Sequence, residues 1–376
     1  MNVIFTCGGT AGHINPAIAV ANILKERHPD ANILFIGAKG HMEEKLVPKA
    51  GYELTCLPGS GLSRSVSLAG LKKNVKAVGN VLGAVSQCKK IIRDFGADVV
   101  VGTGGYASFP ALHAASKLKI PTIVHEANAV PGLTTKMAAK TATRVLVAFE
   151  ESAQYYRNPE KVEVVGMPVR KEFVMTQRED ARKELGLDSR PLVVSAFGSL
   201  GARAMNFAMA DFMKLEMEAG MPFQHIHATG SYGWAWMPDH LKTLGVDPEK
   251  LDGLDMREYI YNMPTVMAAA DVIISRAGAS TLNEIGASGT PCILIPSPNV
   301  TNDHQTKNAK VLADRGGAVL IPEGEGMGQK LYDTVTQLLS NHERRSAMSA
   351  ALRNIVVLDC AERMCGMIEE LAAKHH

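Results

Sequence analysis

Twice along the chain, an apolar strand runs directly into a glycine-rich turn that opens a helical segment. The first turn is Cys7-Gly8-Gly9-Thr10-Ala11-Gly12, and the second is Phe197-Gly198-Ser199-Leu200-Gly201. Around both turns, short apolar strands alternate with helical stretches, a pattern typical of parallel sheets covered by helices on both faces. Because the pattern restarts, and because 376 residues exceed one typical core, we expect an α/β protein with two doubly wound, Rossmann-like domains.

The expected elements follow from apolar runs and helical periodicity. The expected strands cover residues 3–7, 32–36, 99–102, 122–125, 145–148, 192–196, 224–228, 272–275, 292–295 and 318–321. The expected helices include residues 17–26, 110–118, 204–219, 281–287, 302–315 and 361–374. Gly and Pro punctuate the chain at Val165-Gly166-Met167-Pro168. We therefore predict an N-terminal domain of residues 1–165, joined by a C-terminal helix at 355–376, and a C-terminal domain of residues 166–354.

Composition narrows the class of protein. Hydrophobic residues make up 46% and charged residues 21% of the chain, as in ordinary folded proteins, and the net charge of +2 indicates no nucleic-acid partner. No run of about 18 apolar residues is present, and the N-terminus lacks the features of a signal peptide. The six cysteines are scattered without a C-x-x-C pair, which favours buried free thiols in a reducing compartment. We expect a cytoplasmic protein without a cofactor.

The first glycine turn is a candidate ligand site, because doubly wound sheets bind ligands at the carboxyl ends of their strands. Glycine lets the backbone approach an anionic group, although a tight strand-to-helix turn also needs glycine for its geometry alone. Pro16 suits an early helical position, so we expect the helix to open near Asn15. His13 ends the turn and either takes the proton of an attacking hydroxyl or is structural.

Two further polar segments follow strands of the first half. Gly104, Gly105 and Tyr106 follow one strand, where the backbone is expected to approach a bound substrate closely, either the acceptor or the donor of a group-transfer reaction. Glu126 and Asn128 follow the next strand. Glu126 is a candidate base or hydroxyl-orienting group, and Asn128 is a candidate hydroxyl ligand. The alternative for both is a loop that hydrogen-bonds its own backbone.

In the second half, Arg276 follows a strand and leads into a helix whose N-terminus can hold a diphosphate with backbone amides. Glu284 is expected in the first helical turn, where it either grips ribose hydroxyls or completes a capping box. Asp303-His304-Gln305 precedes another helix and supplies either donor-sugar contacts or a cap. No D-x-D pair occurs, which disfavours a metal-dependent transferase and a metal site.

Residues 61–93, which we name the basic stretch, contain no acidic residue. Its basic residues are Arg64, Lys72, Lys73, Lys76, Lys89, Lys90 and Arg93, and its apolar ones are Leu62, Val66, Leu68, Leu71, Val75, Val78, Val81 and Leu82. A basic amphipathic surface of this type can rest on an anionic membrane, and solvated helix faces have the same composition.

Seven ordered motifs together resemble the MurG family of N-acetylglucosaminyltransferases: G-G-T-A-G-H, G-T-G-G-Y, H-E-A-N, P-V-R, G-S-L-G-A-R, S-R-A-G-A-S-T-L-N-E and D-H-Q-T-K-N-A. The resemblance covers nearly the whole chain. It implies the GT-B fold, in which two Rossmann-like domains face a cleft. It also implies transfer of N-acetylglucosamine (GlcNAc) from UDP-GlcNAc to the C4 hydroxyl of N-acetylmuramic acid (MurNAc) in lipid I, undecaprenyl-diphosphate-MurNAc-pentapeptide, giving lipid II for peptidoglycan synthesis.

The resemblance also implies site residues and a location. UDP-GlcNAc would contact Thr10, Ala11, Gly12, Asn128, Arg170, Ser199, Ile260, Arg276, Ala279, Ser280, Thr281, Leu282, Asn283, Glu284 and Gln305. Within this set, Ile260 would touch the uracil through its backbone, and Glu284 would bind the ribose. The protein would lie peripherally on the inner face of the cell membrane, with the basic stretch toward the lipid.

The chain departs from the family pattern in two places. The second turn, Phe197–Ala202, stands where the family usually has G-G-S-Q-G-A, so it loses a glycine and, at Leu200, a glutamine, and Met167 stands where asparagine is common before P-V-R. The motifs leave open whether His13 or Glu126 is the base. They also leave open rival functions on the same fold. These are a diacylglycerol glycosyltransferase, a non-catalytic UDP-sugar-binding protein and a UDP-GlcNAc 2-epimerase.

Overall fold

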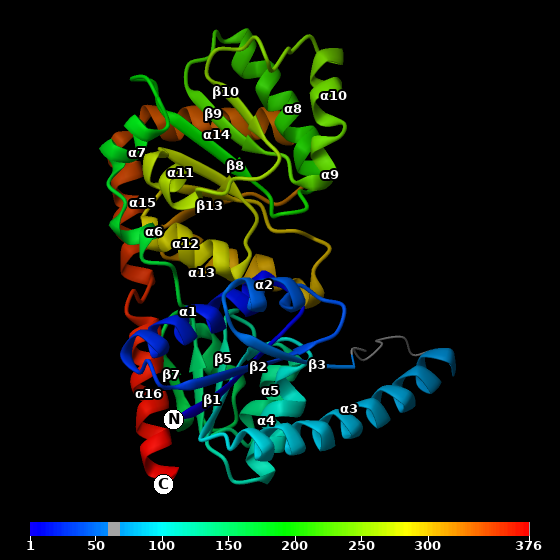
Figure 1. Cartoon of the computed structure of the whole chain (residues 1–376). Helices are drawn as coiled ribbons and strands as arrows, with labels where there is room; N and C mark the ends of the chain where they lie inside the picture. The colour runs from blue at the N-terminus through cyan, green and yellow to red at the C-terminus, as the bar shows by residue number, and fades with distance from the viewer. Residues whose placement is uncertain (59–67, 376) are drawn as a thin grey trace. The chain divides into compact units, whose positions relative to one another are not determined.

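The computed structural model describes residues 1–58 and 68–375, with the side chains of 68–80 and 301 left out of the description. The chain forms two compact units (Figure 1). The first, the N-terminal unit, comprises Met1–Val169 and Val357–His376, and the second, the C-terminal unit, comprises Arg170–Val356.

The N-terminal unit is built on a seven-stranded parallel sheet with the strand order β3-β2-β1-β4-β5-β6-β7. Its strands are β1 (Asn2–Cys7), β2 (Asn32–Ala38), β3 (Glu53–Leu57), β4 (Val99–Gly104), β5 (Thr122–Glu126), β6 (Arg144–Val147) and β7 (Val162–Val164). Its helices are α1 (Ala11–Arg27), α2 (Glu43–Lys49), α3 (Leu68–Phe95), α4 (Ser108–Lys117), α5 (Leu133–Ala139), η1 (Glu150–Tyr155), η2 (Pro159–Lys161) and α16 (Cys360–His375).

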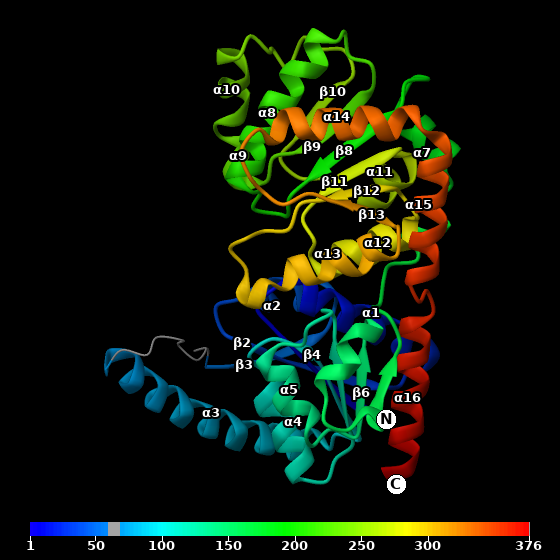
Figure 2. The same cartoon turned by 180° about the vertical axis from the view of Figure 1, so that it is seen from behind.

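Alternating side chains of this sheet bury both of its faces. Val3 and Phe5 of β1 pack into a cluster with residues of α1, α2 and α16, whereas Ile4 packs into a cluster with residues of α3, α4 and α5. Strands buried on both faces read as continuous apolar runs, which explains why the sequence signal was strong here. The C-terminal helix α16 lies along α1 and thus belongs to the N-terminal unit (Figures 1 and 2).

The C-terminal unit has a six-stranded parallel sheet with the order β10-β9-β8-β11-β12-β13. Its strands are β8 (Leu192–Ala196), β9 (Gln224–Ala228), β10 (Leu254–Arg257), β11 (Val272–Ser275), β12 (Cys292–Leu294) and β13 (Ala318–Leu320). Its helices are α6 (Glu172–Met175), α7 (Arg178–Glu184), α8 (Arg203–Glu218), α9 (Ser231–Trp234), α10 (Met237–Thr243), α11 (Met263–Ala269), α12 (Ala279–Ser288), η3 (Thr301–Asp303), α13 (His304–Asp314), α14 (Met327–Ser340) and α15 (His342–Ile355).

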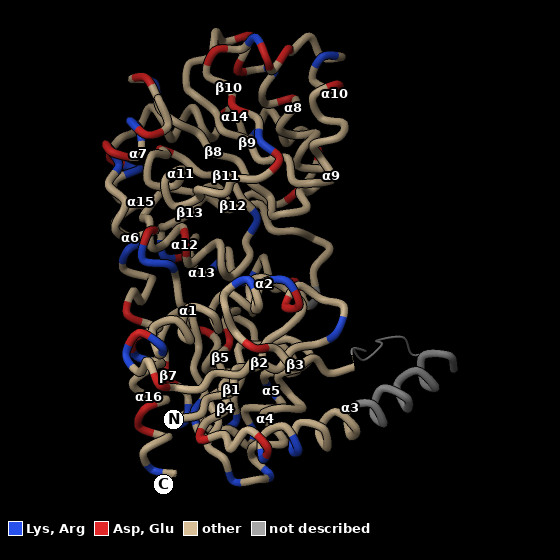
Figure 3. The backbone as a smooth tube through the Cα atoms, in the orientation of Figure 1, with Lys and Arg blue, Asp and Glu red and all other residues tan. Residues whose placement is uncertain are grey.

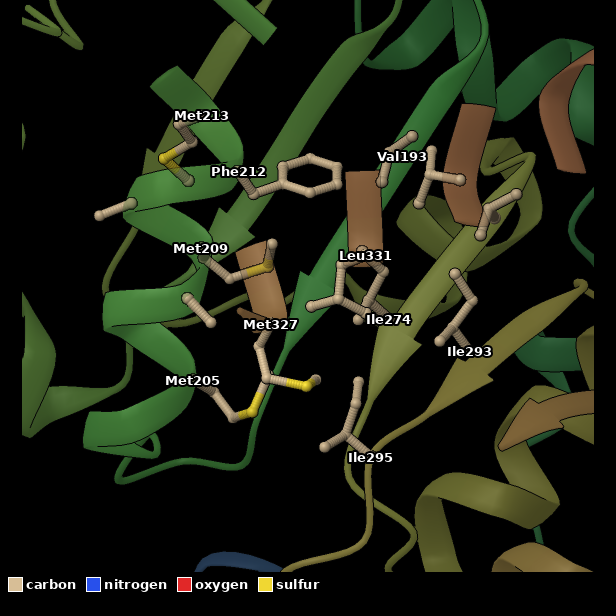
Figure 4. Packing of buried hydrophobic residues seen from close by; sticks show 14 of the residues in the cluster. Val193, Met205, Met209, Phe212, Met213, Ile274, Ile293, Ile295, Met327 and Leu331 are labelled. Carbon is tan, nitrogen blue, oxygen red and sulfur yellow. The ribbon is translucent and has the colours of Figure 1, made fainter. Parts of the chain in front are cut away.

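One face of this sheet packs on α8 and α14 through a methionine-rich cluster (Figure 4). Met205, Met209 and Met213 of α8 lie at helical spacing beside Phe212, and Ile274 and Ile293 reach them from the sheet. Unbranched methionine side chains adapt to irregular gaps, so they fill the space between the sheet and the two helices. The rigid sheet then fixes the loops at its carboxyl edge.

All the strands predicted from the sequence are confirmed to within two residues at each end. The three strands that the sequence did not reveal, β3, β7 and β10, each lie at an edge of a sheet. Their side chains are mostly exposed or half-buried, so they lack a continuous apolar run.

Two helix starts correct the sequence expectations. Helix α1 begins at Ala11 rather than near Asn15, so His13 lies in its first turn and Pro16 lies inside it. Helix α12 begins at Ala279, so Glu284 lies in the second turn and not in the first, and it is not a capping-box residue.

Charged residues of both signs are interspersed in the described part of the chain. Lysine, arginine, aspartate and glutamate are dispersed over both units (Figure 3). No helix in the described part of the chain is long and apolar enough to cross a bilayer. Five of the six cysteines are buried and all six are free thiols, with Cys56 half-buried.

Candidate active site

The carboxyl ends of β1, β4 and β5 lie side by side in the N-terminal unit, because these strands are neighbours in the sheet. The first glycine turn follows β1, Gly104 ends β4 with Gly105 directly after it, and Glu126 ends β5. The structure therefore brings together the candidate residues that the sequence placed in this half.

Glycine is required where the first glycine turn meets the turn after β4. Gly105 has a φ of +88°, and a Cβ there would lie 2.8 Å from the carbonyl carbon of Gly8. Gly104 has a φ of +114°, and a Cβ there would lie 2.6 Å from Nδ1 of His13. At these two positions the structural explanation of the glycines holds, since any side chain would push the turns apart.

His13 is held by the neighbouring strand end. Its Nδ1 lies 3.1 Å from the carbonyl oxygen of Thr103, and the Thr103 hydroxyl donates to the carbonyl of His13 at 2.6 Å. Because a carbonyl oxygen only accepts hydrogen bonds, Nδ1 carries the hydrogen in this contact. The neutral ring then has Nε2 as its basic nitrogen, which is the arrangement that a general base needs.

Glu126 is buried and its carboxylate serves its own loop. Oε1 accepts from the backbone N–H and the side-chain amide of Asn128 at 3.0 and 2.9 Å, and Oε2 accepts from the N–H of Gly132 at 3.0 Å. Three hydrogen bonds favour the loop-forming alternative for Glu126 over the role of base. They also orient Asn128.

Tyr106 is half-buried beside these turns. Burial raises the pKa of its phenol, and the hydroxyl has no hydrogen-bond partner among the described residues. A neutral tyrosine hydroxyl can both donate to and accept from a bound hydroxyl or carbonyl group. It is therefore a polar group near this edge whose hydrogen-bonding capacity the described residues of the unit do not use.

His125 belongs to the H-E-A-N motif, which by itself indicates no role for it. It is buried, and its Nε2 donates to the carbonyl of Gly166 at 2.8 Å. Burial lowers the pKa of this imidazole, which keeps it neutral. His125 thus ties the end of β5 to the segment that leads out of the N-terminal unit.

In the C-terminal unit, the second glycine turn packs against the loop after β9. Gly201 and Gly230 have φ values of +79° and +72°, and a Cβ on either would overlap backbone atoms of the other loop. The N–H of Ser231 donates to the carbonyl of Ser199 at 3.2 Å. The Ser199 side chain itself is exposed and can contact a ligand.

The N-terminus of α12 presents the backbone amides expected for a diphosphate. Ala279, Ser280 and Thr281 are half-buried in its first turn, where helical N–H groups have no acceptor within the helix. The side chains of Leu282 and Asn283 are buried in the unit, so they support the turn from inside. This geometry suits an anionic group at Ala279–Thr281.

Glu284 lies one turn further along α12. Burial raises the pKa of its carboxyl to about 7, and the nearby Arg170 guanidinium opposes this shift. A half-buried carboxyl of this kind binds hydroxyl groups either as acceptor or, when protonated, as donor. Arg170 itself is exposed, with its guanidinium 5.1 Å from the centre of the Phe173 ring.

Arg276 and Gln305 make internal hydrogen bonds. The Arg276 guanidinium donates to the carbonyls of Ile295 and Pro296 at 3.1 and 3.2 Å and pairs with Glu323 at 2.5 Å. Oε1 of Gln305 accepts from the N–H of Ser297 at 2.9 Å. Both side chains therefore shape the loop after β12.

Ile260 is buried between two exposed tyrosines on the loop after β10. The rings of Tyr259 and Tyr261 meet edge to face with centroids 4.9 Å apart, and Tyr261 is 86% exposed. A buried Ile260 leaves its backbone to contact a ligand. These tyrosines were not among the predicted site residues, and the signal in the sequence that could have revealed them is the pair of aromatics in a polar loop.

Comparison with known proteins identifies the family. The glycosyltransferase family 28 N-terminal domain matches residues 3–147, and the family 28 C-terminal domain matches residues 192–364. A relative from Acetivibrio thermocellus is 39% identical over 372 residues, covering 99% of this chain and 98% of its own length. It is named UDP-N-acetylglucosamine–N-acetylmuramyl-(pentapeptide) pyrophosphoryl-undecaprenol N-acetylglucosamine transferase. The chain belongs to this transferase family, the MurG family.

Other MurG family relatives and solved structures agree. A Lactococcus lactis transferase of the same name is 37% identical over 99% of this chain and 100% of its own length. The crystal structure of Acinetobacter baumannii MurG matches with a TM-score of 0.75 at 26% identity, over 98% of this chain and 99% of that one. A UDP-GlcNAc 2-epimerase from Neisseria meningitidis shares the fold at 14% identity, with a TM-score of 0.66 over 98% of this chain and 100% of that one. The GT-B fold predicted from the sequence is thus confirmed.

The two departures from the MurG family pattern lie in different surroundings. Leu200 is 54% exposed on the second glycine turn, whereas Met167 is buried. The Leu200 side chain therefore changes the surface next to Ser199, and Met167 changes the packing of the segment that leaves the N-terminal unit.

Proposed function

We propose that this enzyme transfers GlcNAc from UDP-GlcNAc to the C4 hydroxyl of MurNAc in lipid I, the acceptor class that the names of its relatives print. The observation that carries the chemistry is the contact between Nδ1 of His13 and the carbonyl of Thr103. It fixes the ring and makes Nε2 the basic nitrogen. An alcohol attacking a sugar needs such a base as its proton leaves.

The reaction is an inverting displacement. Nε2 of His13 takes the proton from the C4 hydroxyl of MurNAc as its oxygen attacks the anomeric carbon of GlcNAc. The bond from that carbon to the diphosphate oxygen breaks on the opposite side, and UDP leaves. The amide groups at Ala279–Thr281 stabilise the charge that develops on the diphosphate, and the exposed Arg170 adds a cation. The product carries a β-1,4 linkage.

The remaining site residues bind and orient the donor and the acceptor. Glu284 is proposed to bind the ribose, the backbone of Ile260 the uracil, and Ser199 the diphosphate. In the N-terminal unit, Thr10, Ala11, Gly12 and Asn128 are proposed to contact the donor, and Gly104, Gly105 and Tyr106 the acceptor. Arg276 and Gln305 act through the loop that they hold after β12, as their internal hydrogen bonds support.

We also propose that the protein rests on the inner face of the membrane through the basic stretch. Arg64, Lys72, Lys73 and Lys76 lie outside the residues whose side chains the structure describes. In the described part of α3, Cys88 and Ile92 are buried, and Lys90 and Arg93 are exposed. The described part of the helix thus packs its apolar side on the core of the N-terminal unit and exposes basic side chains, which can bind anionic lipid headgroups. Sedimentation with vesicles containing phosphatidylglycerol should fall when Lys72, Lys73 and Lys76 become Glu; unchanged sedimentation would contradict this.

The transfer itself is tested with purified protein, labelled UDP-GlcNAc and three acceptor conditions. Label should pass to a lipid I analogue and not to diacylglycerol. Labelling of diacylglycerol would favour the rival transferase, and a changed sugar with no acceptor present would favour an epimerase. UDP-GlcNAc binding without any transfer would indicate a non-catalytic binding protein.

A further inference from the structure

Glu43 is a fully buried carboxylate that the proposed mechanism does not use. It is the first residue of α2 in the N-terminal unit, and its exposed fraction is 0%. Glutamate is almost never fully buried without partners, because moving its charge out of water is unfavourable. The partners of Glu43 therefore indicate what it is for.

The carboxylate joins the ends of two neighbouring strands. Oε2 accepts from the N–H of Gly9 at 3.0 Å, and Oε1 accepts from the N–H of Ala38 at 2.8 Å. Gly9 follows β1 and Ala38 ends β2, and these strands pair in the sheet. Glu43 thus holds the first glycine turn to the end of β2 by hydrogen bonds from both backbones.

Two glycines are shaped around this side chain. A Cβ at Gly8 would lie 2.7 Å from Oε1 of Glu43, and a Cβ at Gly37 would lie 2.6 Å from its Cγ. Gly9 has a φ of +87° and no atom within 4 Å of an added Cβ, so it is the conformation of Gly9 and not crowding that needs glycine there. The conformation of the first turn therefore depends on its contacts with Glu43.

The same turn sets the position of His13. The carbonyl of Thr10, the residue after Gly9, accepts from the N–H groups of His13 and Ile14 at 3.0 and 3.2 Å and so begins α1. Gly8 packs on Gly105, and Gly104 packs on the His13 ring. A shift of Gly8 or Gly9 would move the ring relative to Thr103.

We propose that Glu43 is a positioning residue for the transfer reaction, which acts by fixing the first glycine turn and, through it, the orientation and tautomer of His13. This inference rests on the proposed role of His13 as the base. A carboxylate is required because two backbone donors face its two oxygens. A glutamine offers one oxygen and places an NH₂ group against the second N–H, so one amide loses its acceptor.

The test compares Glu43→Gln with Glu44→Gln, a matched control on the exposed side of the same helix. E43Q should lower kcat at least tenfold and leave the KM for UDP-GlcNAc within twofold, whereas E44Q should stay within twofold in both. In a His13→Ala background, E43Q should lower the residual rate less than threefold. A loss in E43Q that only follows the folded fraction, or a full tenfold loss in the H13A background, would overturn the proposal.

Two further measurements cover the cases in which E43Q fails to fold or the wild type does not transfer GlcNAc. Glu43→Asp keeps both acceptor oxygens on a side chain one methylene shorter, and it should lower kcat with the KM for UDP-GlcNAc unchanged. A folded and fully active E43D would refute the positioning role. ¹⁵N NMR of His13, assigned with the His13→Asn variant, needs no activity. The Nδ1–H tautomer should dominate in the wild type and lose population in E43D, and an identical spectrum in both would also refute it.

Discussion

Gly105→Ala tests how closely the first glycine turn packs against the turn after β4. A Cβ at Gly105 would lie 2.8 Å from the carbonyl carbon of Gly8, and ordinary van der Waals contact begins at 3.4 Å. The carbonyl oxygen of Gly8 would lie closer still, so the two turns must separate by more than 0.6 Å. Gly9→Ala is the matched control, because Gly9 has nearly the same φ, +87° against +88°, and open space around an added Cβ.

The expected free energies differ by the overlap alone. A side chain at positive φ costs about 1–2 kcal/mol, and the loss of glycine entropy in the unfolded chain returns about 0.4–1 kcal/mol. Both variants share these contributions. Forcing an extra methyl group into packed backbone adds about 1–3 kcal/mol in Gly105→Ala only. The difference between the two variants should therefore be about 1–3 kcal/mol in the free energy of unfolding.

Urea unfolding measures this difference, with two probes because a chain of two units need not unfold in one transition. Both tryptophans, Trp234 and Trp236, lie in the C-terminal unit, so their fluorescence follows that unit, whereas far-UV circular dichroism follows both. The transition seen only by circular dichroism should move to lower urea in Gly105→Ala than in Gly9→Ala. Equal midpoints for the two variants would refute the packing argument.

Three other perturbations test separate parts of the site. Burial raises the pKa of Glu284 from 4.5 to about 7, so the stability that its protonated form contributes is fully present below pH 4.5 and is lost as the pH rises through 7. At about 1.4 kcal/mol per pH unit, the free energy of unfolding should fall by up to about 3 kcal/mol over this range, and Glu284→Gln should remove that fall. Urea unfolding followed by tryptophan fluorescence at pH 5 and pH 8 measures it, and the same fall in the variant would contradict the assignment. Arg276→Ala should destabilise the C-terminal unit by about 2–3 kcal/mol, because two carbonyls and Glu323 lose their partner. Arg170 is exposed, so Arg170→Ala should raise the KM for UDP-GlcNAc without moving the unfolding midpoint. The reverse pattern would exchange the roles of the two arginines. Glu126→Gln should lower kcat mainly by loosening the Asn128 loop, and it should leave the pH dependence of kcat/KM unchanged. His13→Gln should abolish the fall of kcat/KM at acid pH. Loss of this acid limb in Glu126→Gln would make Glu126 the base.

The interior of each sheet could be predicted from the sequence, because strands such as β1 and β4 bury both faces and read as unbroken apolar runs. The edge strands β3, β7 and β10 could not, because side chains facing solvent interrupt their apolar pattern. The start of α1 was misplaced for a related reason. Its first buried side chain is Ile14, so periodicity gives no signal at Ala11, and Pro16 suggested a later start.

The glycine turns could be located from the sequence, but the partners of the polar side chains could not. Arg276 pairs with Glu323, and Glu43 accepts from Gly9, at separations along the chain that no local pattern encodes. Glu126 illustrates the difference in a short segment. Its position after β5 suggested a base or an orienting group, and only its three hydrogen bonds show that its carboxylate builds the loop.

The configuration of the new glycosidic bond tests the proposed reaction most directly. The proposed reaction is a single displacement, in which the acceptor oxygen attacks the anomeric carbon opposite to the leaving diphosphate, and such a step inverts that carbon. The donor sugar of UDP-GlcNAc is α-linked. In the proton NMR spectrum of the purified product, the coupling between H1 and H2 of the transferred GlcNAc should therefore be that of a β linkage. An α-linked product would show retention and would contradict a single displacement with His13 as the base.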